Sequence, residues 1–333
     1  MKKILWIFFT KYPDNIASYR MSGIPSAENL KIPKVIYLED ANEVDFLNHS
    51  RPNVLIFAKP FHSKAIDLAK YAKQLGIKLI LTCDDWNFIE NSNNPKDDVE
   101  NIVKRNKIMT EIAKVSDRVV VKTNLAAEIA FKNSGIKCDV IPDCLEKSGN
   151  KTIKKINLPL KVGWFGNNTN LDTLLFGIKQ ISMSKNIINL KIVTNLTSKK
   201  EIDNFKICLK KINLKHIKIN FIQWNINYDK LLEDVEIIMI PYIDDDVRKV
   251  KSLHRVIESL NMGKIVICND TSTTKDLHDY CVLGRINEGI EWVINNQELA
   301  IKKAGEGREW VLKNYSVKTI SSQWLELINQ INE

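Results

Sequence analysis

A helix is predicted over Lys251–Gly263, and its polar side chains have the types and the spacing of a binding site. At about 100° per residue, Lys251, Arg255 and Glu258 share one arc, with His254 at its edge. The apolar side chains share the opposite arc, namely Leu253, Val256, Ile257 and Leu260. Cations near a helix N-terminus suit a phosphate, because unpaired backbone N–H groups there already favour anions. A carboxylate further along the helix suits a pair of sugar hydroxyls, so the segment indicates a nucleotide diphosphate site.

A second candidate for the diphosphate is the turn GWFGNNTN at Gly163–Asn170, between a predicted strand and a predicted helix. Glycine lets the backbone approach a phosphate closely in such a turn. The turn is not the GxGxxG dinucleotide pattern, and Gly-Asn turns also occur here for purely conformational reasons. We assign Gly166, Asn167 and Asn168 to the diphosphate, together with Lys251 and Arg255.

In the first half of the chain, polar residues follow predicted strands. Ser18 and Arg20 lie in the turn after the first strand, and Asp84 follows the strand KLILTC. Open α/β sheets bind ligands beyond the carboxyl ends of their strands, so these three residues are candidates for a cleft that receives an acceptor. For Arg20, an exposed side chain in a loop is an equally good interpretation.

The elements that position these residues alternate between short apolar strands and longer amphipathic helices. Strands are predicted at ILWIFF, VIYL, VLIFA, KLILTC and VVVK, then at KVGWFG, LKIV, IKINFI, EIIMI and KIVIC. Helices are predicted at 62–75, 99–115 and 124–133, and two more follow each other at 296–315 and 316–329. Continuous apolar strands that alternate with helices indicate parallel sheets covered on both faces. The polar, basic stretch 146–158 interrupts the pattern as a linker does.

Length and composition are those of ordinary globular protein. With 333 residues, 44% of them apolar, the chain can form about two domains that each bury a core. We interpret MKKILWIFFT as the first buried strand rather than a signal peptide, because Lys11 ends the apolar run and no small-residue cleavage site follows. No stretch approaches the roughly 20 apolar residues of a membrane helix.

The net charge of +9 fits an acidic partner, such as an anionic membrane surface or a phosphorylated substrate, or it reflects lysines scattered over solvated faces. Nucleic acid is not expected, because the basic residues form no stripe interleaved with aromatics. The six cysteines show no CxxC pair and no zinc-like spacing. We therefore predict a reducing, cytoplasmic location and no metal site.

On these residues and elements, the chain resembles the GT-B glycosyltransferases, especially the nucleotide-sugar enzymes of family 4. The family's run E-A-hydrophobic-A-x-G-x-P-V-V corresponds to Glu258–Ile267, with Glu258 and Gly263 kept and Ile265 in place of the usual proline. The resemblance spans nearly the whole chain. The family's earlier glutamate near the sugar has no counterpart at Val250 or Lys251.

The resemblance implies two Rossmann-like, doubly wound parallel-sheet domains facing a cleft. Residues 1–145 would form the acceptor domain, 146–160 the linker and 161–315 the donor domain. The helix at 316–333 would pack on its own domain or cross back to the first. A nucleotide-sugar is then the donor and co-substrate without a separate cofactor, Glu258 binds the donor ribose, and cationic side chains offset the diphosphate charge without a metal.

For the reaction, the resemblance implies transfer of a sugar to a glycan or lipid-linked acceptor in bacterial surface polysaccharide assembly, with contact to the inner membrane face. Retention is favoured over inversion. Asp85 is a candidate general base in an inverting transfer or an orienting carboxylate in a retaining one. His62 either binds donor sugar hydroxyls or caps the following helix. The alternatives are a degenerate, non-catalytic nucleotide-sugar-binding protein of the same fold and a UDP-sugar epimerase.

Overall fold

The computed structural model describes residues 3–84, 99–146, 149, 155–195, 198–245 and 248–331. The chain forms two compact units. Unit 1 comprises Met1–Glu146, Asp245–Ser252 and Asn314–Glu333, and unit 2 comprises Lys147–Asp244 and Leu253–Lys313.

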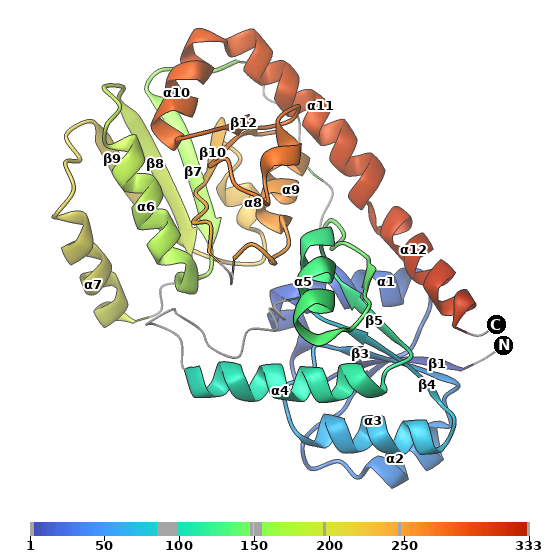
Figure 1. Cartoon of the computed structure of the whole chain (residues 1–333). Helices are drawn as coiled ribbons and strands as arrows, with labels where there is room; N and C mark the ends of the chain where they lie inside the picture. The colour runs from blue at the N-terminus through green and yellow to red at the C-terminus, as the bar shows by residue number, and fades with distance from the viewer. Residues whose placement is uncertain are drawn as a thin grey trace. The chain divides into compact units, whose positions relative to one another are not determined.

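Unit 1 is built on a six-stranded parallel sheet in the order β2-β1-β3-β4-β5-β6 (Figure 1). Its strands are β1 (Ile4–Phe8), β2 (Lys34–Ile36), β3 (Val54–Ala58), β4 (Lys78–Thr82), β5 (Arg118–Val121) and β6 (Asp139–Val140). The central strand β3 is buried at every position, as expected of an apolar run covered on both faces. The two-residue β6 was not predicted, because so short a strand has no apolar periodicity.

Helices cover both faces of this sheet (Figure 1). One face packs against α2 (Glu43–Ser50), α3 (Lys64–Gln74) and α4 (Val99–Val115). The other face packs against α1 (Ile24–Asn29) and the C-terminal helix α12 (Val317–Gln330), where Trp324 meets Trp6 edge to face with ring centroids 4.8 Å apart. The fifth helix, α5 (Asn124–Ser134), joins β5 to β6.

Unit 2 has a second six-stranded parallel sheet in the order β12-β11-β10-β7-β8-β9. Its strands are β7 (Leu160–Gly166), β8 (Ile188–Thr194), β9 (Ile217–Gln223), β10 (Ile237–Ile240), β11 (Ile265–Cys268) and β12 (Val282–Leu283). Its helices are α6 (Leu171–Ile181), α7 (Lys199–Leu209), α8 (Tyr228–Leu231), α9 (His254–Asn261), α10 (Ile286–Asn295) and α11 (Gln297–Tyr315), the last of which ends in unit 1. The sequence thus predicted the α/β class and ten of the strands correctly, and missed the two-residue β6 and β12.

One short segment departs from the order of the sequence. Asp245–Ser252 follows β10 of unit 2 but belongs to unit 1, where Val250 packs with Val121 and Ala126. Residues 248–251 form a turn and a bend, so the predicted helix over Lys251–Gly263 begins only at His254. Val250 is buried among side chains of unit 1, and this packing accounts for the late start of the helix.

Candidate functional site

The sheet of unit 2 changes direction at β7. The chain runs outward from β7 through β8 and β9 on one side and through β10, β11 and β12 on the other. In doubly wound sheets, such a switch point opens a crevice at the carboxyl ends of the two central strands, where ligands bind. Gly166 ends β7, and Pro241 and Tyr242 follow β10. The predicted diphosphate residues Gly166, Asn167 and Asn168 therefore lie at the switch point.

Arg255, from the first turn of α9, reaches the same place. Its guanidinium carbon lies 5.8 Å from the centroid of the Trp164 ring, and a Cβ added at Gly166 would lie 3.4 Å from Arg255 Nη1. Trp164 is fully buried in β7, so it offers the guanidinium a fixed aromatic surface. The structure thus brings together Gly166 and Arg255, two residues that the sequence assigned to one ligand from separate motifs.

The positive charge of Arg255 also acts on Tyr242, which follows β10, and changes the pKa of its hydroxyl. Burial raises the pKa of Tyr242 to about 12, and Arg255 opposes this rise because it favours the phenolate. The backbone N–H of Tyr242 donates to Asn269 Oδ1 at 3.1 Å, after β11. The ends of β7 and β10 therefore both lie near Arg255, and a hydrogen bond joins the residue after β10 to the end of β11.

Glu258 is buried in α9 with 2% of its surface exposed. Its Oε1 lies 3.6 Å from His254 Nε2, and Asn261 Nδ2 donates to its Oε2 at 3.4 Å. Both arcs of α9 are enclosed, because every residue from His254 to Asn261 except Arg255 is buried. The carboxylate of Glu258 is therefore an enclosed polar group inside the predicted binding face.

Lys251 does not lie on α9. It precedes the helix in the segment that belongs to unit 1, and its backbone N–H donates to Arg248 O at 3.1 Å. The helical spacing that placed Lys251 and Arg255 on one arc therefore does not apply, because the residues between them are not helical until His254. The structure leaves Arg255 as the cation that the helix itself positions.

The two asparagines after Gly166 already have hydrogen-bond partners. Asn167 Oδ1 accepts from the Thr169 N–H, and the Asn168 N–H donates to Asn195 Oδ1 at 2.8 Å. The side-chain amide of Asn168 donates to Glu201 Oε1 at 2.8 Å. These bonds fix the shape of the turn, so the backbone N–H of Asn168 would bind a phosphate only after leaving Asn195.

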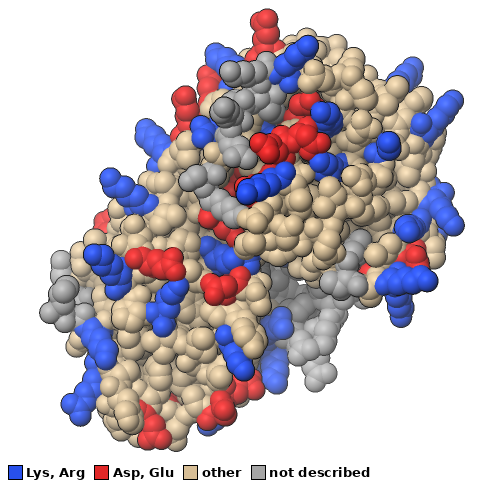
Figure 2. Space-filling view, turned by 180° about the vertical axis from the view of Figure 1, so that it is seen from behind, with Lys and Arg blue, Asp and Glu red and all other residues tan. Residues whose placement is uncertain are grey.

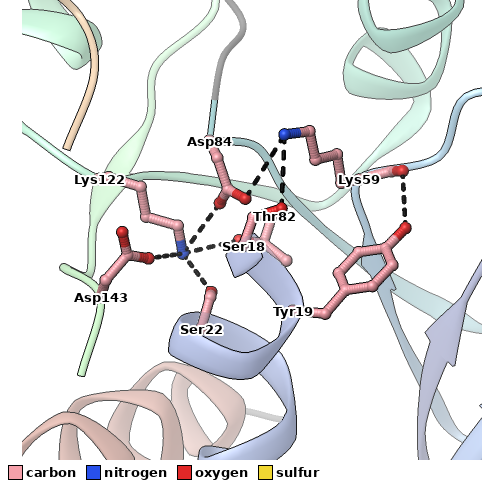
Figure 3. A network of polar contacts seen from close by, with 8 residues as sticks. All are labelled: Ser18, Tyr19, Ser22, Lys59, Thr82, Asp84, Lys122 and Asp143. Carbon is pink, nitrogen blue, oxygen red and sulfur yellow. Dashed lines mark hydrogen bonds and ion pairs between the residues drawn. The ribbon is translucent and has the colours of Figure 1, made fainter. Parts of the chain in front are cut away.

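In unit 1, a buried lysine connects three strand ends (Figure 3). Lys122 follows β5, its side chain is fully buried, and its Nζ lies 3.7 Å from Asp84 Oδ1 and 3.7 Å from Asp143 Oδ1. It also donates to Ser22 Oγ and, at 3.2 Å, to Thr82 Oγ1. Opposite charges of this kind offset the cost of burying an ammonium group. The candidate Asp84 is therefore held by Lys122, a residue that was not among the predicted site residues.

A second lysine holds Asp84 from the other side. Lys59 Nζ lies 3.9 Å from Asp84 Oδ2 and donates to Ser18 Oγ at 3.4 Å, which brings the two predicted residues Ser18 and Asp84 to one site (Figure 3). Lys59 has a left-handed backbone with φ of 44°, which is unfavourable for a residue with a side chain. Its carbonyl accepts from Tyr19 OH at 3.2 Å, and burial raises the pKa of Tyr19.

Local structure explains how the first turn reaches this network. Tyr19–Gly23 forms a π-helical turn, a form that is frequent at functional sites, and it directs Tyr19 and Ser22 toward the strand ends. Lys122 and Asp143 could have been found in the sequence, since Lys122 follows an apolar strand directly, as Asp84 does. Asp143 carries a weaker signal, because β6 is too short to be predicted.

Arg20 does not point freely into solvent. Its Nε lies 2.5 Å from Glu146 Oε1, and its Nη1 donates to the carbonyl oxygen of Asp14 at 2.9 Å. Only 11% of the Arg20 side chain and 6% of the Glu146 side chain are exposed. The alternative of an exposed loop arginine is therefore wrong, and a phosphate or acidic acceptor would have to compete with Glu146 for this guanidinium.

His62 is buried between β3 and α3 in an aromatic setting. Its ring stacks on Tyr37 with centroids 6.1 Å apart and meets Phe9 edge to face at 5.3 Å. Within the described ranges, neither ring nitrogen makes a hydrogen bond of good geometry. Burial lowers the pKa of His62, and Glu39 and the Tyr37 backbone offset this only in part. The other candidate catalytic residue, Asp85, lies outside the described residues.

Two further properties concern metals and membranes. Within the part of the chain that the structure describes, no group of three or more His, Cys, Asp or Glu side chains is arranged to hold a metal ion. None of the described helices combines the length and apolar character needed to cross a bilayer.

Comparison with known proteins supports the architecture. The sequence matches no protein-family model and no curated protein. The structure is similar to the crystal structure of HepE from Anabaena in complex with UDP and glucose, with a TM-score of 0.74, 12% identity and coverage of 99% of this chain and 100% of HepE. A glycosyltransferase from Rickettsia africae gives a TM-score of 0.66, 13% identity and coverage of 99% and 98%.

TarM from S. aureus gives a TM-score of 0.60 and 18% identity over 86% of this chain, which spans 58% of the TarM chain. At these identities the likeness shows the fold. The chain has the GT-B fold of these glycosyltransferases, as its sequence predicted.

Proposed function

We propose that this protein is a glycosyltransferase that moves a sugar from a UDP-sugar donor to a glycan or lipid-linked acceptor. The proposal includes a role in bacterial surface polysaccharide assembly. It also includes retention of the anomeric configuration during the transfer. The enzyme would act in the cytoplasm, at the anionic inner face of the membrane. HepE was crystallised with UDP and glucose and also with UDP-glucose, which supports UDP as the nucleotide of the donor.

The observation that carries the proposal is the meeting of Arg255 and Gly166 at the switch point of the second sheet. A guanidinium can form two parallel hydrogen bonds to a phosphate, and a glycine lets the phosphate approach the backbone. The beginning of α9 adds backbone N–H groups and the positive end of the helix dipole. Together they suit the two phosphate groups of a nucleoside diphosphate.

The remaining assignments complete the donor and acceptor sites. We assign the ribose hydroxyls to Glu258, and Asn167 and Asn168 to the diphosphate with Gly166. Lys251 stays a candidate for the diphosphate, although α9 does not position it. In unit 1 we assign acceptor contacts to Ser18, Asp84 and Arg20, and roles in the reaction to Asp85 and His62. No metal is required, because the Arg255 guanidinium and the helix end can offset the charge that develops on the leaving diphosphate.

The first test is isothermal titration of the full chain with UDP, GDP, ADP and CMP and with their common sugar conjugates. We expect UDP to bind. Arg255→Ala should lower the affinity for UDP by about 10- to 100-fold, since a charge-assisted hydrogen bond contributes about 1.5–3 kcal/mol. Arg285→Ala is the matched control, because its side chain is 58% exposed at the start of another helix of unit 2. Equal weakening by both substitutions, or no binding of any nucleotide, would contradict the proposed donor site.

Catalysis is tested separately by following UDP release and the sugar product by NMR, with and without candidate glycan acceptors. Transfer or slow donor hydrolysis supports a transferase. Binding without UDP release indicates the degenerate binding protein, and a changed sugar that remains attached to UDP indicates the epimerase.

A further inference from the structure

A concentration of positive charge lies on α7 and the turn after it. Six lysines between residues 199 and 215 are exposed, namely Lys199, Lys200, Lys206, Lys210, Lys211 and Lys215. Glu201 and Asp203 are the acidic residues of this stretch, which leaves a net charge of +4 out of +9 for the whole chain. We refer to these six lysines with Ile207 as the α7 basic surface.

The helix presents these charges on one side. Lys199, Lys206 and Lys210 follow one another at helical spacing with Asp203, and Lys200, Ile207 and Lys211 form the neighbouring row. Glu201 is engaged elsewhere, since its carboxylate accepts hydrogen bonds from Ser198 and Asn168. Lys and Arg side chains gather along the right-hand edge of Figure 2, on the side where Figure 1 places α7 before the half-turn.

The opposite side of α7 is fixed to the sheet. Phe205 and Leu209 are buried, and the Phe205 ring packs edge to face on Phe221 of β9 with centroids 5.4 Å apart. A capping box at Ser198 and Glu201 secures the beginning of the helix. The basic side is therefore a rigid surface and not a loose tail.

Ile207 distinguishes among acidic partners. Its side chain is 54% exposed in the middle of the lysines. A single exposed apolar residue is common on protein surfaces. Surrounded by lysines on a packed helix, however, it suits a lipid surface, because the ammonium groups reach the lipid phosphates while the isoleucine enters the apolar layer. A soluble polyanion would use the charges but not the isoleucine.

We infer that the α7 basic surface docks the protein onto an anionic lipid bilayer. The inference deepens the membrane part of the proposed function by naming the surface that makes contact, and it does not depend on sugar transfer. Each lysine near an anionic surface contributes about 1 kcal/mol, or roughly fivefold in partitioning. The reversal of three lysines should therefore weaken binding by at least about 100-fold.

The experiment measures co-sedimentation of the full chain with phosphatidylcholine vesicles and with vesicles that also contain phosphatidylglycerol. The test variant is Lys206→Glu/Lys210→Glu/Lys211→Glu. The control, Lys64→Glu/Lys70→Glu/Lys132→Glu, makes the same charge change on three exposed lysines of unit 1. We expect the protein to bind only to the anionic vesicles, and added salt should weaken this binding. The test variant should lose the binding, and the control should largely keep it.

A local probe makes the test specific to α7. Cys208, beside Ile207, is the exposed one of the six cysteines and can carry an environment-sensitive fluorophore. Its emission should shift to the blue with anionic vesicles, whereas a label at Lys132→Cys in a Cys208→Ser background should not respond. UDP affinity is measured in the test variant as well. If it is unchanged, the variant has lost membrane docking and not the donor site.

Several outcomes would overturn the inference. These are an absence of binding to anionic vesicles, equal losses in the two triple variants, and a fluorophore at Cys208 that does not respond to vesicles. Binding to hyaluronate, a soluble acidic glycan, without binding to vesicles would assign the surface to a polysaccharide instead.

Discussion

The guanidinium of Arg255 lies over the indole ring of Trp164, with the guanidinium carbon 5.8 Å from the ring centroid. Trp164 lies in β7 and Arg255 in α9, so the contact joins the central strand of the second sheet to the helix that follows β10. Stacking on a buried ring limits the positions that the guanidinium can adopt. A ligand at the carboxyl end of β7 therefore meets a cation that is already oriented.

Gly166 should be required for this orientation. In Gly166→Ala, the added Cβ would lie 2.9 Å from Trp164 Cη2, which is too close for a buried indole to tolerate without moving. We expect Trp164 and Arg255 to shift and UDP affinity to fall by about tenfold, the cost of a displaced charge-assisted hydrogen bond. The measurement is a double-mutant cycle with Arg255→Ala by isothermal titration. Fully additive losses would show that Gly166 acts independently of Arg255.

Glu258 should affect ligand affinity and stability separately. Glu258→Gln keeps an oxygen that can accept from Asn261 but removes the charge that binds two ribose hydroxyls. We expect UDP to bind about tenfold more weakly to this variant, with a small change in the free energy of unfolding. Glu258→Ala should lose both affinity and about 1–3 kcal/mol of stability, because Asn261 and His254 each lose one of their polar contacts. Unchanged UDP affinity in Glu258→Gln would remove Glu258 from the ribose site.

Lys122 should stabilise the first sheet strongly. In Lys122→Met, the carboxylates of Asp84 and Asp143 lose a fully buried ammonium partner, and we expect the free energy of unfolding to fall by about 3–5 kcal/mol. Urea denaturation measures this loss. The triple variant Lys122→Met/Asp84→Asn/Asp143→Asn removes these three charges together and should recover part of the loss, since it also ends the ion pair between Lys59 and Asp84. A loss below about 1 kcal/mol in Lys122→Met would indicate that water already solvates the carboxylates.

His62 should make stability depend on pH. Its pKa is lowered in the folded protein, whereas the unfolded chain has a value of about 6.5, so the unfolded state binds the proton first as the pH falls. The contribution is therefore fully present above about pH 6.5 and is lost as the pH falls toward the lower folded pKa. We expect His62→Phe, which keeps an aromatic ring between Phe9 and Tyr37, to flatten this decline.

Urea denaturation at about pH 7.5, 6.0 and 5.0 measures the free energy of unfolding on either side of the unfolded pKa of histidine, which is about 6.5. His278→Gln is the control, because the His278 side chain is 71% exposed. If His62→Phe and the wild type lost stability in parallel, the proton uptake would belong to other groups.

The sequence by itself determined the α/β class and ten of the twelve strands in the described residues, because continuous apolar runs of this length are typical of buried strands between helices. It also assigned Gly166 and Arg255 to one ligand from local chemistry, a glycine at a strand end and a cation at the beginning of a helix, and that assignment stays a prediction. It could not reveal that the two lie together, since this depends on β7 and β10 being neighbours in the sheet.

Only the tertiary structure decided where helical periodicity ends. The pattern extended the helix back to Lys251, but packing of Val250 against Val121 and Ala126 holds that segment in unit 1, and α9 begins at His254. Tertiary structure also supplied Lys122 and Asp143 as partners of Asp84. These residues are distant in sequence, and they meet because parallel strands end at the same edge of the sheet.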